Sequence, residues 1–331
     1  MPLLCVQNLT TTFNTHHGAI DVCRNINLSI QTGATMGLIG ETGCGKSVLG
    51  MSILRLLPRE ATVRGQVYFK QRNILTMDRA TLQNLRGSKI ALLPQSPSTS
   101  LNPVLKIGRQ IAEGIKLHQK TNRFQAWCAG VELLKFFKIP QASHMAHVYP
   151  HQLSGGMKQR ALTAVSMTGE PELLIADEPT KGLDALLRAQ VVTVLKQMVR
   201  QTGAALLLIT HDLKVAANLC DQIAVMYAGE IVEQGATGHI LVHPRHPYTR
   251  GLMAALPENG MYPIPGYGPG LFNLPPGCKF HLRCSLAEPL CAQKSPPLLE
   301  SGTTKVRCWF VDSSGQHKQN ISNRSFQETA V

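Results

Sequence analysis

Long apolar segments are absent from this sequence of 331 residues. One of its longest apolar runs, AALLLI at residues 204–209, spans six residues, whereas a membrane-spanning helix needs roughly 20. The opening residues, MPLLCVQNLT, also lack a basic segment followed by an apolar stretch, so they do not resemble a secretory signal. We therefore expect a cytoplasmic protein with no membrane span of its own.

Runs of five or more like charges are absent too, although the chain is basic. Its 33 Lys and Arg outnumber 20 Asp and Glu, which gives a formal net charge of +13. Without a charged run, no nucleic-acid-binding tail is predicted. The positive net charge has three possible explanations: phosphorylated ligands, the anionic inner face of a membrane, or a surplus with no partner. A 44% hydrophobic and 16% charged content is ordinary for a globular fold.

The first 250 residues alternate short runs rich in Val, Ile and Leu with longer helical patterns. Such alternation is typical of helices packed around a mainly parallel sheet, which is an α/β fold. The expected strands are residues 35–39, 90–93, 173–176, 204–209 and 222–226.

The stretch of about 80 residues between the second and third expected strands has helical character and few strand signals. We interpret it as an inserted helical subdomain at about 96–165, with helices near 106–119 and 125–137. The sequence then becomes rich in Pro and Gly, which is typical of loops. We therefore predict one domain over 1–250 and a small, irregular, cysteine-containing extension over 251–331.

A glycine-rich segment directly after the first expected strand matches the pattern G-x-x-x-x-G-K-(S/T) in full. A chance match in a chain of this composition has a frequency of about one in a hundred. In this pattern, glycines let backbone N–H groups curl around phosphates, and the following helix adds its positive N-terminal end. Lys46 would contact the β- and γ-phosphates, and Ser47 would offer a hydroxyl to Mg²⁺. The predicted nucleotide-binding residues are Gly40, Glu41, Thr42, Gly43, Cys44, Gly45, Lys46 and Ser47.

Two carboxylates, Asp177 and Glu178, follow the apolar run at 173–176. The end of a strand places them at the carboxyl edge of the sheet, where α/β folds bind ligands. We expect Asp177 to bind Mg²⁺ and Glu178 to orient or deprotonate an attacking water. An apolar run that ends in two carboxylates can also be an ordinary strand end exposed to solvent. Together with the glycine-rich segment, however, it indicates an ATPase of the phosphate-loop class.

The string LSGGMKQR at residues 153–160 resembles the LSGGQ signature of ATP-binding-cassette (ABC) proteins, with Met157 where the commonest form has Gln. Other phosphate-loop ATPases lack this string. The resemblance implies that Ser154, Gly155 and Gly156 form a second phosphate-binding helix start. In this family that start faces the ATP held by a partner subunit, so that two chains enclose two nucleotides.

Four more residues take family roles by the same resemblance. Gln95 resembles the glutamine that contacts Mg²⁺ or water and senses the membrane partner, and Asp184 resembles the aspartate at the dimer contact. His211 resembles the switch histidine that bonds the γ-phosphate. Phe13 resembles the aromatic residue that stacks on adenine. With Glu178, these residues complete the hydrolytic set and imply an active ATPase.

Three further segments resemble the oligopeptide/dipeptide/nickel importer branch of the family. They are PQSPSTSLNP at 94–103, HPYT at 246–249, and the cysteine-bearing extension. A turn that packs on the core is an equally good explanation of HPYT. One departure is TKGLD at 180–184, where the branch more often has TTALD, so that Lys181 and Gly182 change the contact with a partner.

The branch implies a peripheral ATPase subunit on the cytoplasmic face of the cell membrane. Its partners would be a second ATPase subunit in a heterodimer and two transmembrane permease subunits, with a solute-binding protein engaged indirectly. The implied cargo is a dipeptide or oligopeptide, with nickel or a metal–chelator complex as the alternative. A non-transport ABC ATPase fits less well, because DNA-repair members insert long coiled coils and ribosome-acting members carry two cassettes per chain.

Nine cysteines are present, and in the cytoplasm we expect them to stay reduced. Four of them are spaced C-x5-C-x6-C-x16-C, without the tight pair that is usual for structural zinc. Four thiolates on looped chain can hold a 4Fe–4S cluster, and the extension resembles those that do so in peptide-importer ATPases. Zinc and ordinary reduced thiols remain alternatives, and a metal- or redox-binding regulator would explain only this last quarter of the chain. The four are Cys278, Cys284, Cys291 and Cys308.

Overall fold

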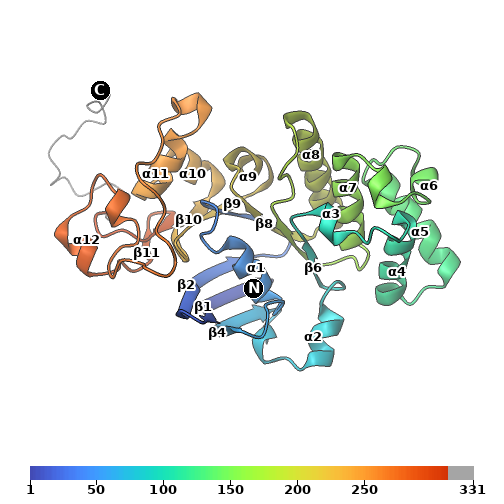
Figure 1. The fold of residues 1–331 in the computed structure, drawn as a ribbon, viewed down its shortest axis with the longest axis horizontal. Coiled ribbons are helices and arrows are strands. Elements are labelled where there is room, and N and C mark those ends of the chain that lie inside the picture. The colour runs from blue at the N-terminus through green and yellow to red at the C-terminus, as the bar shows by residue number, and fades with distance from the viewer. Residues whose placement is uncertain (312–331) are drawn as a thin grey trace.

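The computed structural model describes residues 1–311 and is built around an eight-stranded sheet (Figure 1). Its strand order is β11-β12-β10-β9-β3-β8-β7-β6. Neighbouring strands from β9 to β6 are parallel, and every residue of β3 and β8 is buried. Strands buried on both faces appear in sequence as continuous apolar runs, which is why they were predicted closely. These five are β3 (Thr35–Ile39), β6 (Ile90–Leu93), β7 (Leu173–Asp177), β8 (Ala205–Thr210) and β9 (Gln222–Tyr227).

The other half of this sheet is antiparallel, so the sheet is mixed. β10 (Glu230–Ala236) pairs with β9 on one side and with β12 (Thr304–Val306) on the other, and β11 (Leu299–Ser301) forms the edge. Residues beyond 250 therefore extend the central sheet. The sequence prediction of a small, irregular extension did not include these two strands, because three residues are too few to show an alternating pattern.

A second, four-stranded antiparallel sheet has the order β2-β1-β4-β5 and was not predicted. The helix α1 (Lys46–Ile53) contacts strands of both sheets, and its Leu49 and Ile53 share one apolar core with them. This helix is therefore packed between the two sheets. The strands are β1 (Leu4–Thr15), β2 (Gly18–Ile30), β4 (Ala61–Phe69) and β5 (Arg72–Asn73).

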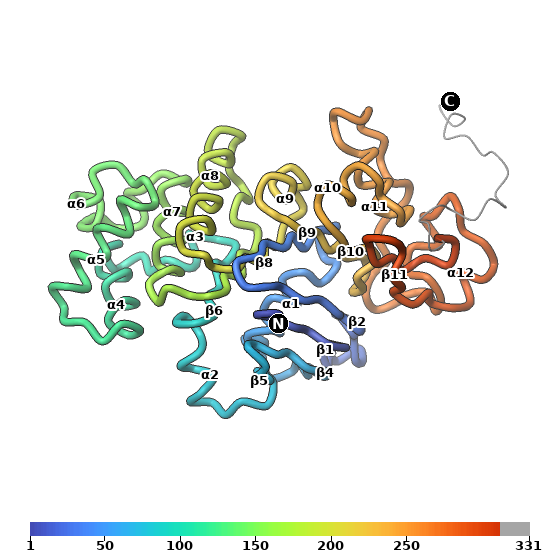
Figure 2. The backbone as a smooth tube through the Cα atoms, turned by 180° about the vertical axis from the view of Figure 1, so that it is seen from behind, coloured from blue at the N-terminus to red at the C-terminus, as the bar shows by residue number. Residues whose placement is uncertain are grey.

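The predicted helical region is present between β6 and β7, and it packs around a single apolar core with α8. Figures 1 and 2 place this region and the C-terminal part (residues 251–311) at opposite ends of the long axis, with α1 between them. Among residues 1–311, no helix combines the length and the apolarity needed to cross a bilayer. The remaining helices are α2 (Arg79–Leu85), α3 (Pro97–Ser100), α4 (Ile107–Gln119), α5 (Arg123–Phe136), α6 (Ala142–Met145), α7 (Gly155–Ser166), α8 (Ala185–Thr202), α9 (Leu213–Leu219), α10 (Thr237–Val242), α11 (Pro247–Ala254) and α12 (Pro289–Gln293).

Candidate functional site

The glycine-rich segment at residues 40–47 forms a tight loop between β3 and the start of α1, which we call the phosphate loop. Its glycines at 40, 43 and 45 all have positive φ, which non-glycine residues rarely adopt. Space is also limiting, because a Cβ at Gly40 would lie 2.1 Å from the carbonyl oxygen of Met226. At Gly45 a Cβ would lie 2.6 Å from the carbonyl oxygen of Val22. The loop can therefore keep its curvature only with glycine at these two positions.

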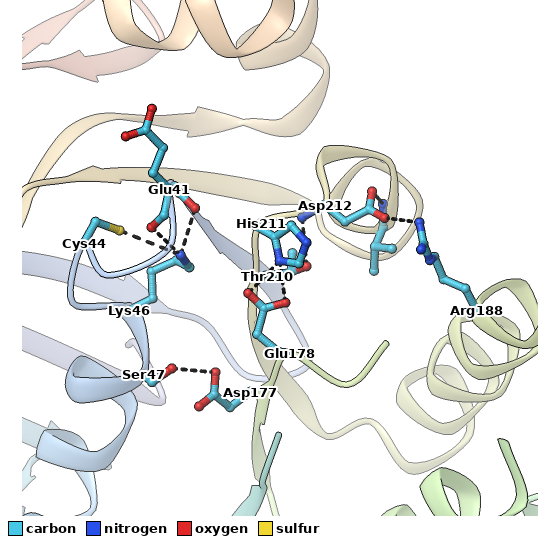
Figure 3. A network of polar contacts seen from close by, with 12 residues as sticks. Glu41, Cys44, Lys46, Ser47, Asp177, Glu178, Arg188, Thr210, His211 and Asp212 are labelled. Atoms are coloured by element: carbon cyan, nitrogen blue, oxygen red, sulfur yellow. Dashed lines mark hydrogen bonds and ion pairs between the residues drawn. The ribbon is translucent and has the colours of Figure 1, made fainter. Parts of the chain in front are cut away.

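Lys46, the first residue of α1, is buried beneath this loop. Its ammonium donates hydrogen bonds to the carbonyl oxygens of Gly40 and Glu41, at 2.8 and 2.9 Å (Figure 3). It also lies 3.8 Å from the sulfur of Cys44. The positive charge is thus held on the inner side of the curve, where the backbone N–H groups of such loops bind phosphate oxygens.

Ser47 and Asp177 meet at the end of the sheet although they are 130 residues apart in sequence. The Ser47 hydroxyl donates to Oδ1 of Asp177 over 2.9 Å. Burial raises the pKa of the Asp177 carboxyl, and the Ser47 hydrogen bond opposes that shift. A hydroxyl and a carboxylate beside a phosphate site are the oxygen ligands that Mg²⁺ prefers, so these two residues fit that ion.

Glu178 and His211 form the second pair of the site. Nδ1 of His211 lies 2.9 Å from Oε1 and 2.8 Å from Oε2 of Glu178. Glu178 is buried and has a φ of 47°, a sparsely populated conformation for a residue other than glycine. Backbone strain of this kind is often found at active sites. The pair stands at the ends of the adjacent strands β7 and β8, beside Asp177 and the phosphate loop (Figure 3).

The structure gathers the four cysteines of the C-terminal part around one cavity. Cys278, Cys284, Cys291 and Cys308 all line it, together with apolar residues that include Phe280. Burial raises the pKa of Cys278 to about 11 and that of Cys284 to about 12. Within residues 1–311, no group of three or more Cys, His, Asp or Glu side chains is arranged to hold a metal ion. The structure therefore shows a shared cavity without a formed metal site.

Comparison with known proteins identifies the family. The family model for ABC transporters matches residues 23–181, and the model for the oligopeptide/dipeptide transporter C-terminal region matches residues 232–291. The oligopeptide transport ATP-binding protein OppD of Haemophilus influenzae is 40% identical, with 93% of this chain and 97% of that protein covered. The chain belongs to the ABC transporter ATPases of the oligopeptide/dipeptide importer family. The dipeptide transport ATP-binding protein DppD of Bacillus subtilis is 38% identical over 95% of this chain and 96% of that protein.

Solved structures agree with this assignment. The dimeric ATP-binding cassette MJ0796, in a post-hydrolysis state bound to ADP and Pi, superposes with a TM-score of 0.64 and 25% identity. The match covers 71% of this chain and 98% of that chain. This chain therefore has the ABC ATPase fold, with its mixed, mainly parallel sheet and helical region. As an ABC transporter ATPase, it hydrolyses ATP to drive transport.

The other predicted residues of this ABC ATPase take no part in the hydrogen bonds described above for Lys46, Ser47 and Glu178. Ser154 caps α7 by accepting a hydrogen bond from the backbone N–H of Met157, and Gly155 and Gly156 begin that helix. Figures 1 and 2 both place α7 in the helical region, apart from α1. Asp184 is exposed and caps α8. Gln95, just after β6, and Phe13, on β1, are each half-buried.

One ion pair of the site was missed by sequence reasoning. Arg188 donates from Nη1 to Oδ2 of Asp212 over 2.9 Å (Figure 3). Asp212 directly follows His211 and also caps α9. The pair therefore ties the first turn of α8 to the residue next to His211. Arg188 belongs to no motif and lies 24 residues from Asp212, so no sequence pattern indicates this contact.

Proposed function

We propose that this chain is the ATPase subunit of an ABC importer of dipeptides and oligopeptides, acting at the cytoplasmic face of the membrane. The observation that carries the proposal is the convergence at one sheet edge of Lys46, the Ser47–Asp177 pair and the Glu178–His211 pair. The cargo is inferred from relatives of about 40% identity that are named for oligopeptide and dipeptide transport. Nickel or a metal–chelator complex is the alternative cargo of the same branch.

Each side chain of the cluster has a distinct task in this proposal. Lys46 would exchange its two carbonyl partners for the β- and γ-phosphates, because a phosphate oxygen is the stronger acceptor. Ser47, Asp177 and Gln95 would hold Mg²⁺, which neutralises charge that develops on the phosphates. Glu178 would orient the attacking water, and His211 would bond the γ-phosphate while keeping the Glu178 carboxylate in place.

The partner contacts follow from the residues that lie outside this cluster. Ser154, Gly155 and Gly156 begin α7 away from α1, and Asp184 is exposed at the start of α8, which suits contact with the ATP of a second ATPase subunit. The dimeric state of the similar solved cassettes supports this arrangement. We propose a heterodimer, with Phe13 against adenine and Gln95 next to one of two permease subunits.

The two predicted domains also remain a proposal. We assign residues 1–250 to nucleotide binding, with the helical subdomain at about 96–165, and residues 251–331 to a C-terminal extension. The match of the C-terminal-region family model to residues 232–291 supports a separate sequence module there. Residues 312–331 of the proposed extension lie outside the described part of the chain.

We further propose that the four-cysteine cavity binds a 4Fe–4S cluster. The shared cavity supports this, because four thiols with largely apolar neighbours suit such a cluster. Replacing Cys291 with serine is expected to remove most bound iron, whereas Cys128→Ser, an exposed cysteine on α5, leaves it unchanged. The measurement is iron and acid-labile sulfide per chain after anaerobic purification. Wild-type protein with neither iron nor sulfide would exclude the cluster. One zinc ion per chain would instead identify the cavity as a zinc site.

The cargo is tested in membranes that contain the complete transporter. Vesicles with both permease subunits, both ATPase subunits and the solute-binding protein are expected to accumulate labelled dipeptides or oligopeptides when ATP is supplied on the ATPase side. Omission of ATP or of this chain is expected to reduce uptake to background. ATP-dependent accumulation of nickel without peptide uptake would contradict the proposed cargo and favour the alternative.

A further inference from the structure

One arginine of the C-terminal part reaches the phosphate loop. Arg283 has only 8% of its side chain exposed, and its Nη1 donates to Oε2 of Glu41 over 2.9 Å. The same Nη1 lies 3.3 Å from the hydroxyl of Tyr227, and Nε donates to the carbonyl oxygen of Pro265 over 2.9 Å. The guanidinium also lies 5.8 Å from the centre of the Tyr227 ring. The Phe280 ring lies 6.0 Å away, so Arg283 is fixed by three hydrogen bonds and two rings, and it holds the Glu41 side chain.

The backbone of Glu41 is held from the same side. Its N–H donates to the hydroxyl of the fully buried Tyr248 over 2.9 Å. Burial raises the pKa of Tyr248, so this hydroxyl stays neutral. Tyr248 packs against Tyr227 and Phe280, with ring centres 4.5 and 5.4 Å away. Tyr248 of α11 therefore fixes the main chain, and Arg283 of the C-terminal part fixes the side chain, of the second residue of the loop.

The direction of the Glu41 side chain explains why its ion pair with Arg283 matters for nucleotide binding. The Glu41 carbonyl oxygen accepts a hydrogen bond from Lys46, but its carboxylate extends away from Lys46 (Figure 3). A Cβ at Gly268 would lie 3.1 Å from the same carboxylate, so the chain after α11 passes close beside it. Without Arg283, an unpaired negative charge would remain on a loop that has to bind a triphosphate. Like charges repel, and water screens this repulsion only in part, because 32% of the Glu41 side chain is exposed.

We propose that Arg283 is a positioning residue of the ATP site, which acts through Glu41. It neutralises the Glu41 carboxylate and holds it outside the loop, so that the C-terminal part forms one wall of the nucleotide-binding site. Phe272 supports this placement, because its ring lies 6.5 Å from that of His17, in the turn that joins β1 to β2. The inference rests on the proposed function only in that this loop binds ATP.

The test compares variants of the full-length chain by the dissociation constant of a fluorescent ATP analogue with Mg²⁺, and by KM and kcat of the assembled ATPase. Arg283→Ala is expected to raise the dissociation constant and KM roughly tenfold, since it leaves the Glu41 charge without a partner. Its effect on kcat is expected to be small, because Arg283 acts through Glu41 and bonds to neither Glu178 nor His211. Arg283→Lys is expected to recover only part of the affinity, because it restores the positive charge but not the guanidinium hydrogen bonds to Tyr227 and Pro265.

The double variant Glu41→Gln/Arg283→Ala separates positioning from general stability. If the unpaired carboxylate causes the loss, removing it is expected to restore most of the affinity that Arg283→Ala loses. Arg250→Ala is the matched control, because Arg250 bonds to the Pro244 carbonyl and points about 200° around α11 from Tyr248. We expect it to keep wild-type affinity.

Three results would overturn the proposal. An unchanged dissociation constant in Arg283→Ala would show that the ion pair has no part in nucleotide binding. A loss that the double variant does not restore, with a lower melting temperature, would reduce Arg283 to a packing role. Wild-type chain that fails to bind ATP would refute the proposed function itself, which the first two results leave intact.

Discussion

Glu178→Gln is expected to lower the rate of ATP hydrolysis by about 10²–10⁴-fold, the usual contribution of a general base. Glutamine preserves the shape of the side chain and a hydrogen bond to His211, but it cannot accept a proton from water. The affinity for ATP is expected to stay near that of wild type, because Lys46 and Ser47 are unchanged. The measurement is kcat of the assembled ATPase, with the dissociation constant of a fluorescent ATP analogue measured alongside.

The control for this variant is Glu132→Gln. Glu132 is exposed on α5 and forms a surface ion pair with Lys135, of a type that contributes little to stability. It is expected to keep the wild-type rate. Full ATPase activity in Glu178→Gln would remove Glu178 from the catalytic role and count against the whole assignment of the strand end.

Lys46→Ala is expected to weaken ATP binding by roughly 10- to 100-fold, since a hydrogen bond to a charged group contributes about 1.5–3 kcal/mol. The variant also removes the cation that now bonds the carbonyl oxygens of Gly40 and Glu41. Turnover at fixed ATP is expected to fall with the affinity. Titration of the fluorescent analogue into each variant measures the effect.

Lys305→Ala serves as the control for lost positive charge. Lys305 is exposed on β12 and forms a surface pair with Glu300. Its removal changes the net charge by the same unit, so a general electrostatic effect on ATP would weaken both variants equally. Equal affinities in Lys46→Ala and wild type would exclude the loop as the phosphate site.

The parallel half of the fold could be predicted from sequence because burial on both faces produces unbroken apolar runs. β3 and β6 match the predicted ranges, and β7 and β9 are one residue longer than predicted. The residues of the site come directly after such strands. Because parallel strands end at the same edge of the sheet, the topology alone predicts that these residues lie close together. The antiparallel sheet was missed because β1 and β2 are rich in Thr and Asn, and shifts in register interrupt their alternation.

Contacts between segments far apart in sequence could not be predicted, because no local pattern encodes them. Arg283 and Glu41 are separated by 242 residues, and Arg283 stands in an ordinary polar stretch. Arg188 and Asp212 pair through the packing of α8 beside α9. The spacing of the four cysteines in sequence also did not show whether their side chains lie together in the fold. The structure brings them to a common cavity, while the group bound there remains our proposal.

The pairing of Arg283 with Glu41 also has a consequence for the order of synthesis. The ribosome makes the phosphate loop early, but the arginine that neutralises the loop's carboxylate follows 242 residues later. β12, which completes the antiparallel side of the central sheet, is translated later still. A nascent chain that has emerged only as far as β9 thus has its loop sequence without the wall that positions it. We expect full affinity for ATP to arise at the end of translation, so that unfinished chains compete poorly for cellular nucleotide.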